Sequence, residues 1–479
     1  MRNPCALPLL ALVASLSASP AFSTEIAQPV AANVAQLLQA MQERLTRLEA
    51  RNAELERRLA EPGKLPDNII ARLEDVENEV VAISKKPDPL EKFEGVSVGA
   101  SLIMVAQHAT GGAVDATELS TRADVEVELP GGSIGNAEGK IFAHFRAGDG
   151  DGVDGTANPP STFATANATV FGNQASPVLM QAWYQLDIPV GAASGNLGRV
   201  ELTAGKIDPF GFFDGNNIAD DESEGFMNLA FVHNPLLDAG GDIGVGTHGA
   251  SPGLRVAYVS DINGGNNITA SLGLFGAGSG ADYLDTFSKP LTIAQLEYAG
   301  KTLPGLDGAY RIYAWNNARA MDQVNGFVET VSFGSGGNYD GICDVGEPCE
   351  PGVSERHAGW GISLDQQVAA HTTLFARYGQ STKGSLSFDS AYTLGAQFDG
   401  GAWGREGDRI GLAFGALSTS SEYRIANAAS GSEKIYELFY AWQANDSLQL
   451  TPNLQFIENQ AGAGTDDLMV WGLRAKLAY

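Results

Sequence analysis

From residue 98 onward, apolar and polar side chains alternate along the chain with the period of two that a β-strand imposes. Residues 122–129 carry four charged side chains on one face and four apolar side chains on the other. Residues 448–456 repeat the pattern, with leucine and phenylalanine set against glutamine, threonine and asparagine. The pattern predicts strands at residues 98–106, 121–129, 139–147, 180–188, 199–206, 253–260, 267–276, 291–299, 308–316, 357–365, 372–379, 391–398, 408–415, 434–443, 447–457 and 468–479.

The connections between these strands alternate in length. Long segments follow odd-numbered strands (148–179, 207–252 and 317–356), and short segments follow even-numbered ones (261–266, 366–371 and 444–446). A soluble β-sandwich also alternates in polarity, but this loop pattern and the even strand count are typical of a bacterial outer-membrane barrel. Because lipid tolerates strands only in a closed ring, we expect an all-β transmembrane barrel of about 16 antiparallel strands. It would occupy residues 91–479, surrounded by outer-membrane lipid.

The last predicted strand indicates which face meets lipid. Alternate residues from Met469 to Tyr479 are apolar or aromatic, and an aromatic side chain near a strand end is typical of the membrane interface. Arg474 and Lys476 lie on the opposite face, where water in the lumen can hydrate them.

Residues 1–23 are predicted to be a signal peptide. They open with Arg2, continue in a short apolar run and end in small residues, which places cleavage after Ser23. The run is too short to span a bilayer, and a buried helix is the alternative. Export agrees with a location in the cell outer membrane.

Residues 24–90 are predicted to form a periplasmic α-helical coiled coil. Apolar side chains recur three and four residues apart from Val34 to Leu59, with Asn52 at one core position, and a second series follows a break at 62–66. Arginines placed five residues before glutamates favour a parallel homo-oligomer, since this spacing pairs neighbouring helices. A single helix packed on the barrel is the alternative. The segment is also a candidate for contact with the cell wall or another periplasmic component.

The composition excludes one class of partner. Lysine and arginine number 30 against 57 aspartate and glutamate, a formal net charge of −27 that argues against nucleic acid, whose phosphates would be repelled. The six histidines lack the spacing of a metal site. Gly-x-Ser-x-Gly occurs at residues 131–135 and 249–253, but a predicted strand follows each, and not the helix that a nucleophile elbow requires. We therefore expect no enzyme activity, no bound metal and no cofactor.

Two groups of residues resemble the OprB-type carbohydrate-selective porins. The first is Gly205-Lys206 with Phe213-Asp214-Gly215-Asn216, Asp221-Glu222 and Phe226; the second is Tyr436-Glu437-Leu438-Phe439-Tyr440 with Leu450-Thr451-Pro452-Asn453-Leu454-Gln455, closing on Gly472-Leu473-Arg474. The resemblance covers residues 91–479 and implies a sixteen-stranded barrel that passes saccharides, with a homotrimer as the assembly that suits the family. The coiled-coil segment departs from the family pattern.

The longest connection, 207–252, is the candidate to fold inward, because a sixteen-stranded barrel is wide enough for an open aqueous channel. Its acids would face arginines on the wall and create a transverse field, in which hydroxyl-rich solutes exchange water for protein groups. The acids are Asp214, Asp220, Asp221, Glu222 and Glu224, and the predicted inward arginines are Arg122, Arg146, Arg255, Arg311, Arg377 and Arg409.

Two aromatic side chains, Tyr313 and Trp315, share a predicted inward face with Arg311. Sugars present flat C–H faces that pack on aromatic rings, so these side chains are candidates for sugar contact. The alternative is that both are interface or packing aromatics.

Cys343 and Cys349 lie close together in the outer connection 317–356. An exported protein folds in an oxidising compartment, so we expect a disulfide that clamps this loop. Calcium binding by Asp340, Asp344 and Glu347 is a less favoured alternative.

These features together favour an outer-membrane porin for passive diffusion of small hydrophilic solutes, with carbohydrates and ions as permeants. A general or cation-preferring porin is the alternative within transport, favoured by the net acidity and disfavoured by the inward arginines. From a different class, the chain would be a structural tether that acts through its coiled coil. An outer-membrane hydrolase is disfavoured because no catalytic constellation is present.

Overall fold

The computed structural model describes residues 95–111, 115–153, 162–172, 174–191, 198–237, 249–261, 266–276, 288–303, 305–321, 323–324, 354–464 and 467–479. The predicted signal peptide, the predicted coiled coil and the predicted disulfide between Cys343 and Cys349 lie outside the described residues. So does the alternative calcium site.

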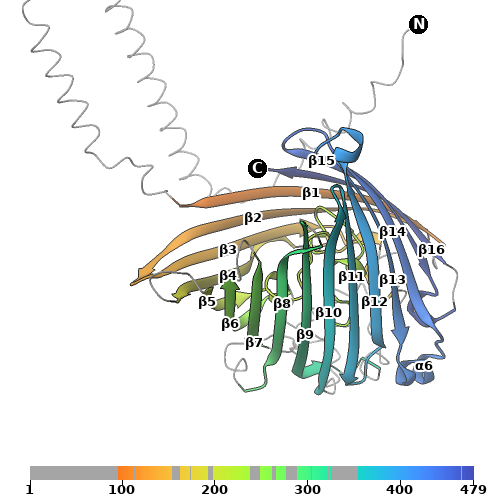
Figure 1. Ribbon diagram of the computed structural model, residues 1–479. Coiled ribbons are helices and arrows are strands. Elements are labelled where there is room, and N and C mark those ends of the chain that lie inside the picture. Colours follow the sequence, from red (N-terminus) through yellow and green to blue (C-terminus); the bar gives the residue numbers. More distant parts are fainter. Residues whose placement is uncertain are drawn as a thin grey trace, which may run out of the picture. The chain divides into compact units, whose positions relative to one another are not determined.

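Sixteen antiparallel strands follow one another around a single ring (Figure 1). They are β1 Ser97–Thr110, β2 Ala116–Ile134, β3 Ala137–Asp149, β4 Gln174–Val190, β5 Gly198–Ile207, β6 Ser251–Asp261, β7 Asn267–Phe275, β8 Leu291–Leu303, β9 Leu306–Met321, β10 Ser354–Ala369, β11 Thr372–Lys383, β12 Phe388–Asp399, β13 Arg409–Thr419, β14 Ser432–Gln443, β15 Leu448–Glu458 and β16 Leu468–Ala478. The predicted strands are confirmed, with ends that shift by a few residues.

The ring closes between the first and the last strand. β1 pairs with β16 from Ser101 opposite Ala478 to Thr110 opposite Met469. Since β1 also pairs with β2, neither strand has a free edge, and every strand of the ring has hydrogen-bonding neighbours on both sides. Closure of this kind satisfies the backbone groups of a sheet in lipid.

The connections alternate around the ring. Those after odd-numbered strands lie at one end, which we call the long-loop end, and those after even-numbered strands lie at the other, the short-turn end. Short helices occur in several connections: η3 Pro209–Gly211, α5 Leu229–Val232, η4 Gly400–Trp403, α6 Ser421–Asn427 and η5 Gln460–Gly462. In the described part of the chain, no helix is long and apolar enough to cross a membrane.

Apolar side chains cover the outer face of the ring, as the period-two pattern predicted. Trp471 and Leu473 on β16 are 53% and 49% exposed, whereas Arg474, the residue that follows Leu473, is buried on the inner face. Other large apolar side chains that remain exposed include Leu102, Leu119, Val125, Leu202, Val256, Leu272, Leu296, Ile312, Leu394, Leu412 and Leu438. A surface of this kind is stable only against lipid.

Aromatic side chains gather toward both ends of the outer face. Toward the long-loop end, Tyr392, Phe414, Tyr436 and Phe456 form a row across β12 to β15, with successive ring centroids 5.8, 4.9 and 6.1 Å apart. Toward the short-turn end, Trp403 packs near Tyr440. Aromatic girdles at two levels are expected at the two membrane interfaces.

Candidate functional site

The connection after β5 folds back into the barrel. We call residues 208–237 the inward loop. Asp208 begins η3 by accepting a hydrogen bond from the Phe210 backbone N–H at 3.0 Å, and Asn228 caps α5 in the same way through the Ala230 N–H. Such side-chain caps satisfy donors that the short helices leave unpaired.

One side of the inward loop packs on an apolar part of the inner wall. Phe213, Phe226 and Phe231 of the loop are at most 1% exposed. Their ring contacts with the wall are Phe213–Phe275, Phe226–Phe375 and Phe226–Phe439, with centroids 6.0, 5.5 and 5.0 Å apart. Burying each ring stabilises the packed loop by roughly 1.5–3 kcal/mol, so the loop fills the β7 to β14 side of the lumen.

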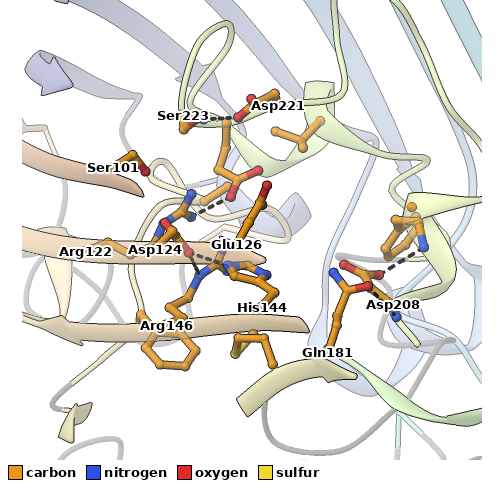
Figure 2. A pocket seen from close by; sticks show the side chains of 18 of the residues that line it. Ser101, Arg122, Asp124, Glu126, His144, Arg146, Gln181, Asp208, Asp221 and Ser223 are labelled. Carbon is orange, nitrogen blue, oxygen red and sulfur yellow. Dashed lines mark hydrogen bonds and ion pairs between the residues drawn. The ribbon is translucent and has the colours of Figure 1, made fainter. Parts of the chain in front are cut away.

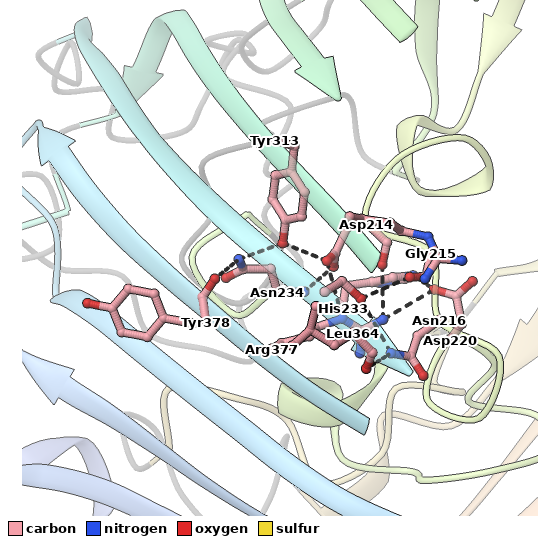
Figure 3. Close-up of polar contacts among 12 residues, drawn as sticks. Asp214, Gly215, Asn216, Asp220, His233, Asn234, Tyr313, Leu364, Arg377 and Tyr378 are labelled. Atoms are coloured by element: carbon pink, nitrogen blue, oxygen red, sulfur yellow. Dashed lines mark hydrogen bonds and ion pairs between the residues drawn. The ribbon is translucent and has the colours of Figure 1, made fainter. Parts of the chain in front are cut away.

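A buried polar network fixes the start of the loop to the same wall (Figure 3). The Tyr313 hydroxyl donates to Asp214 Oδ1 at 2.6 Å, and Arg377 Nε donates to the same oxygen at 3.2 Å. The Asn234 backbone N–H donates to the other carboxylate oxygen at 2.5 Å, and its side chain donates to the Tyr313 hydroxyl at 2.7 Å. Asp214 has φ near +60°, a conformation that costs energy outside glycine and that these contacts hold in place.

The tip of the inward loop, residues 221–225, is held by charged side chains from β2, β13 and β16. Arg122 Nη1 donates to Glu222 Oε1 at 2.5 Å, and Lys476 Nζ donates to Glu224 Oε1 at 2.8 Å. Arg474 Nη1 donates to the carbonyl oxygens of Glu222 and Gly225 at 2.6 and 3.1 Å. The tip therefore reaches strands on both sides of the seam between β1 and β16, and Arg409 of β13 also binds it.

A second segment, residues 162–172, also lies inside the barrel and pairs with the inward loop. The Ala168 N–H donates to the Met227 carbonyl at 2.8 Å, and the Leu229 N–H donates to the Thr165 carbonyl at 3.0 Å. Two carboxylates on β14 hold the two segments: Glu437 accepts from the Met227 N–H at 2.6 Å and from the Asn228 N–H at 3.0 Å. Glu433 accepts from the Phe163 N–H at 2.9 Å.

A cavity of about 710 Å³ lies on the β1 to β4 and β16 side of the lumen (Figure 2). Its lining extends from Asp208 and Ala250, near the long-loop end, to Gly99 and Ala478, near the short-turn end. The cavity is therefore oriented along the direction in which a solute would cross the barrel.

Charged side chains dominate the middle of this cavity. Asp124 accepts hydrogen bonds from Arg122 Nε at 2.8 Å and Arg146 Nε at 2.6 Å, and His144 Nε2 lies 2.7 Å from it. Among the described residues, six carboxylates line the cavity against two arginines and one lysine: Asp124, Glu126, Asp208, Asp220, Asp221 and Glu222 against Arg122, Arg146 and Lys476. The lining thus offers both hydrogen-bond donors and acceptors and carries an excess of negative groups.

The predicted site residues fall into two sets. Arg122, Arg146, Asp220, Asp221 and Glu222 line the cavity. The others hold the loop or the wall: Asp214, Glu224, Arg255, Arg311, Tyr313, Trp315, Arg377 and Arg409. The acids and arginines were expected to oppose each other across a gap, whereas several of them are joined directly, as Glu222 is to Arg122.

The structure departs from the expectation that Tyr313 and Trp315 present a surface to a sugar. Both face inward, but they are only 2% and 3% exposed because the inward loop covers them. The Tyr313 hydroxyl donates its hydrogen bond to Asp214. Periodicity along the strand gave the correct face and no information about the loop above it.

Sequence reasoning missed Glu126, His144, Gln181 and Asp208 as lining residues, and it missed the second inward segment. All four side chains are polar groups of the lumenal face or of the loop start, so the alternation contained a signal for the three that lie on strands. For residues 162–172 the signal was apolar content in a supposed outer loop: Phe163, Ala164 and Ala166 pack inside.

Two acids of the inward loop have opposite shifts in pKa. Burial raises the pKa of Asp220 to about 6, although His233 and Arg377 attract the carboxylate. Burial acts on Glu222 in the same direction, but Arg122 and Arg146 outweigh it and lower the pKa of Glu222 to about 2. Near neutral pH Glu222 is therefore charged, and Asp220 titrates within the physiological range.

Comparison with known proteins gives one family. The family model described as "Carbohydrate-selective porin, OprB family" matches residues 115–479. No curated protein matches the sequence.

Solved structures of porins also match the chain. Pseudomonas putida OprB at high pH is 18% identical, with a TM-score of 0.62, and the match covers 81% of this chain and 95% of that one. The low-pH structure of the same protein is 16% identical with a TM-score of 0.46, covering 81% and 94%. A mutant porin of Rh. blastica is 12% identical with a TM-score of 0.45, covering 80% and 100%.

Proposed function

The chain belongs to the OprB family of carbohydrate-selective porins, and on that premise we propose that small carbohydrates cross it by passive diffusion. It is a porin of the cell outer membrane and not an enzyme. The observation that carries the proposal is the cavity of about 710 Å³ that the inward loop leaves along one side of the lumen. Its lining lets a solute rich in hydroxyls exchange hydrogen bonds with water for hydrogen bonds with protein, which an apolar solute cannot do.

Liposome swelling tests this proposal. Vesicles that contain the purified full-length protein should swell in a pentose or a hexose, and more slowly in disaccharides and trisaccharides, because the inward loop leaves only part of the lumen open. Protein-free vesicles are the control. Salt conductance without swelling in any sugar would contradict a carbohydrate channel.

The tip of the inward loop gives a more specific test. We expect Asp221→Asn together with Glu222→Gln to change single-channel conductance and to lower cation preference, because both side chains line the cavity. Glu458→Gln is the control, since Glu458 pairs with Lys434 at 3.1 Å on the strands and lines no part of the cavity. Unchanged single-channel behaviour would remove the loop tip from the passage.

A cation-preferring porin is supported by a separate observation, the six carboxylates against three basic side chains in the described lining. A cavity with net negative charge raises the local concentration of cations. In a KCl gradient the reversal potential should have the sign of potassium selectivity. Chloride selectivity would contradict this second proposal and would leave sugar flux untouched.

The predicted domain organisation remains part of the proposal. We infer that residues 1–23 are removed on export and that residues 24–90 form a periplasmic coiled coil, which the heptad and arginine–glutamate spacing favour as a parallel homo-oligomer. Three chains is the number that suits the family. Chemical cross-linking of the full chain in detergent should give trimers. A monomer at every protein concentration would contradict this assembly.

A further inference from the structure

Three aromatic rings lie on the lumenal side of the barrel, between the charged part of the cavity and the short-turn end. We call them the aromatic platform: Phe142 of β3, Trp183 of β4 and Phe212 of the inward loop. Phe142 lies directly opposite Trp183 in the β3–β4 pairing, and the two rings stack with centroids 5.0 Å apart and planes 25° apart. Phe212 meets the Trp183 ring edge-on, with centroids 5.6 Å apart. All three rings are partly exposed, in contrast to Tyr313 and Trp315.

The position of the platform is fixed by the pairing of β3 with β4. One inward pair toward the long-loop end, His144 and Gln181, lines the large cavity. The pair Glu138 and Asp187 lies two inward pairs from Phe142 and Trp183 toward the short-turn end. It lines a second cavity of about 470 Å³. The aromatic platform therefore lies between the two cavities on one continuous strip of wall.

Polar groups surround the rings. Trp183 Nε1 donates to Gln181 Oε1 at 3.2 Å, and Gln185 Nε2 donates to Asp187 Oδ1 at 2.8 Å. The Arg255 guanidinium lies over the Phe212 ring at 4.7 Å, and the Lys140 ammonium lies 5.5 Å from the Trp183 centroid. The strip thus combines apolar ring surfaces with donors and acceptors at their edges, the composition of a site that orients a small polar ligand.

We propose that the aromatic platform is a carbohydrate subsite for a pyranose ring, between the charged cavity and the short-turn end. The inference rests on the proposed function, that carbohydrates cross this barrel. A pyranose has a C–H face that can pack on an aromatic ring and a rim of hydroxyls that both donate and accept. An ion has no such face, and an apolar solute could not use the amides and charges at the edges.

Lys140 is the movable part of this subsite. Its side chain is 39% exposed, and its pairing with Glu128 at 3.5 Å is long and half-exposed, so it holds the ammonium weakly. A sugar that packs against the platform displaces the ammonium from the ring and receives it as a hydroxyl partner. The ring surface is kept covered until a sugar arrives.

The test is a sugar titration of the full-length protein in a planar bilayer, with glucose as the probe and current reduction as the readout. Trp183→Leu should raise the glucose concentration that gives half the effect about fivefold, since it removes the ring and keeps apolar bulk. Trp183→Phe should recover most of the affinity. Trp471→Leu is the matched control, because Trp471 lies on the lipid-facing side of β16 and is 53% exposed.

Sorbitol provides a second readout that a general change in pore shape would not reproduce. It carries similar hydroxyls but has no ring face, so Trp183→Leu should slow glucose-driven vesicle swelling and leave sorbitol-driven swelling unchanged. If Trp183→Leu does not assemble, Phe142→Leu tests the same platform. If the wild-type protein passes glucose and the variants need the same glucose concentration for half the effect, the subsite is wrong and the proposed function stands. If the wild-type protein passes no sugar, the proposed function is wrong.

Discussion

Asp220 is a lining residue whose charge depends on pH near neutrality. It lies 3.8 Å from His233 and 3.6 Å from Arg377, at the side of the cavity formed by the inward loop. Burial raises its pKa to about 6, so its folded-state pKa lies above the ordinary value of 3.8. The folded state therefore holds the proton more tightly than the unfolded chain, and stability that is present at low pH is lost as the pH rises through about 6.

We expect cation preference to increase between pH 5 and pH 7, with a midpoint near pH 6, because Asp220 gains its negative charge there. Asp220→Asn should remove this step and make loop packing less dependent on pH over the same range. Reversal potentials in a KCl gradient, measured at each pH, give the readout. A step that persists in Asp220→Asn would assign the titration to another group.

The sequence predicted that these arginines face inward. It could not predict which of them line the cavity. Arg122 and Arg377 both lie on lumenal faces, but Arg122 borders the cavity whereas Arg377 is buried against Asp214. Alternation reports the face of a strand. The burial of one face by a distant loop is decided by packing over 163 residues of separation, as in the contact from Arg377 to Asp214.

At the scale of elements, the strands were predictable and the lumenal segments were only partly so. Each strand has one face in lipid and one in water or packed protein. Apolar and polar residues therefore alternate along the strand with a period of two. The inward loop was predicted from its length. Residues 162–172 were assigned to an outer loop, because nothing local distinguishes a loop that folds inward from one that folds outward except its apolar content.

Glu437 is a wall group that binds the inward loop directly and the second lumenal segment through Met227. It is 3% exposed and accepts from the backbone N–H groups of Met227 and Asn228, and Met227 in turn is bonded to the second segment. We expect Glu437→Ala to lower the free energy of unfolding by roughly 2–4 kcal/mol, since three buried donors, two backbone N–H groups and the Asn453 side-chain amide, lose their acceptor. The loosened loop should also make the single-channel current larger and noisier.

Denaturant unfolding followed by heat-modified gel mobility, together with single-channel recording, checks this expectation. Glu458→Gln is the control, because its pairing with Lys434 is partly exposed and is worth at most about 1 kcal/mol. Equal stability and equal current noise in the two variants would show that β14 does not hold the loop.

At the scale of the whole molecule, the lumen has a packed side and a side that holds the cavity of about 710 Å³. The aromatic contacts of Phe213 and Phe226 fill the β7 to β14 side, and charged groups of β2, β3 and β16 border the cavity. The barrel as such could be predicted from alternation and loop lengths. The off-centre position of the cavity could not be predicted, because it depends on which part of the wall the inward loop packs against.

Deletion of residues 24–90, with the signal peptide retained, should leave single-channel conductance unchanged, because the described barrel forms all of its cavity from residues beyond 98. The deletion should reduce assembly into trimers if the predicted coiled coil joins the chains. Conductance and cross-linking measured on the same preparation separate the two effects. Shedding or blebbing of the outer membrane in cells that carry the deletion would instead favour the tether function.

The contacts at the loop tip have a consequence for biogenesis. Arg122 and Arg474 come from strands on either side of the seam where β1 meets β16, and both hold the same short turn, which precedes Arg474 by 252 residues. Arg474 is fully buried, so its guanidinium finds those carbonyl groups only when the turn is already inside. We therefore expect closure of the final seam and insertion of the loop to be coupled during folding, because these contacts form only when both are in place.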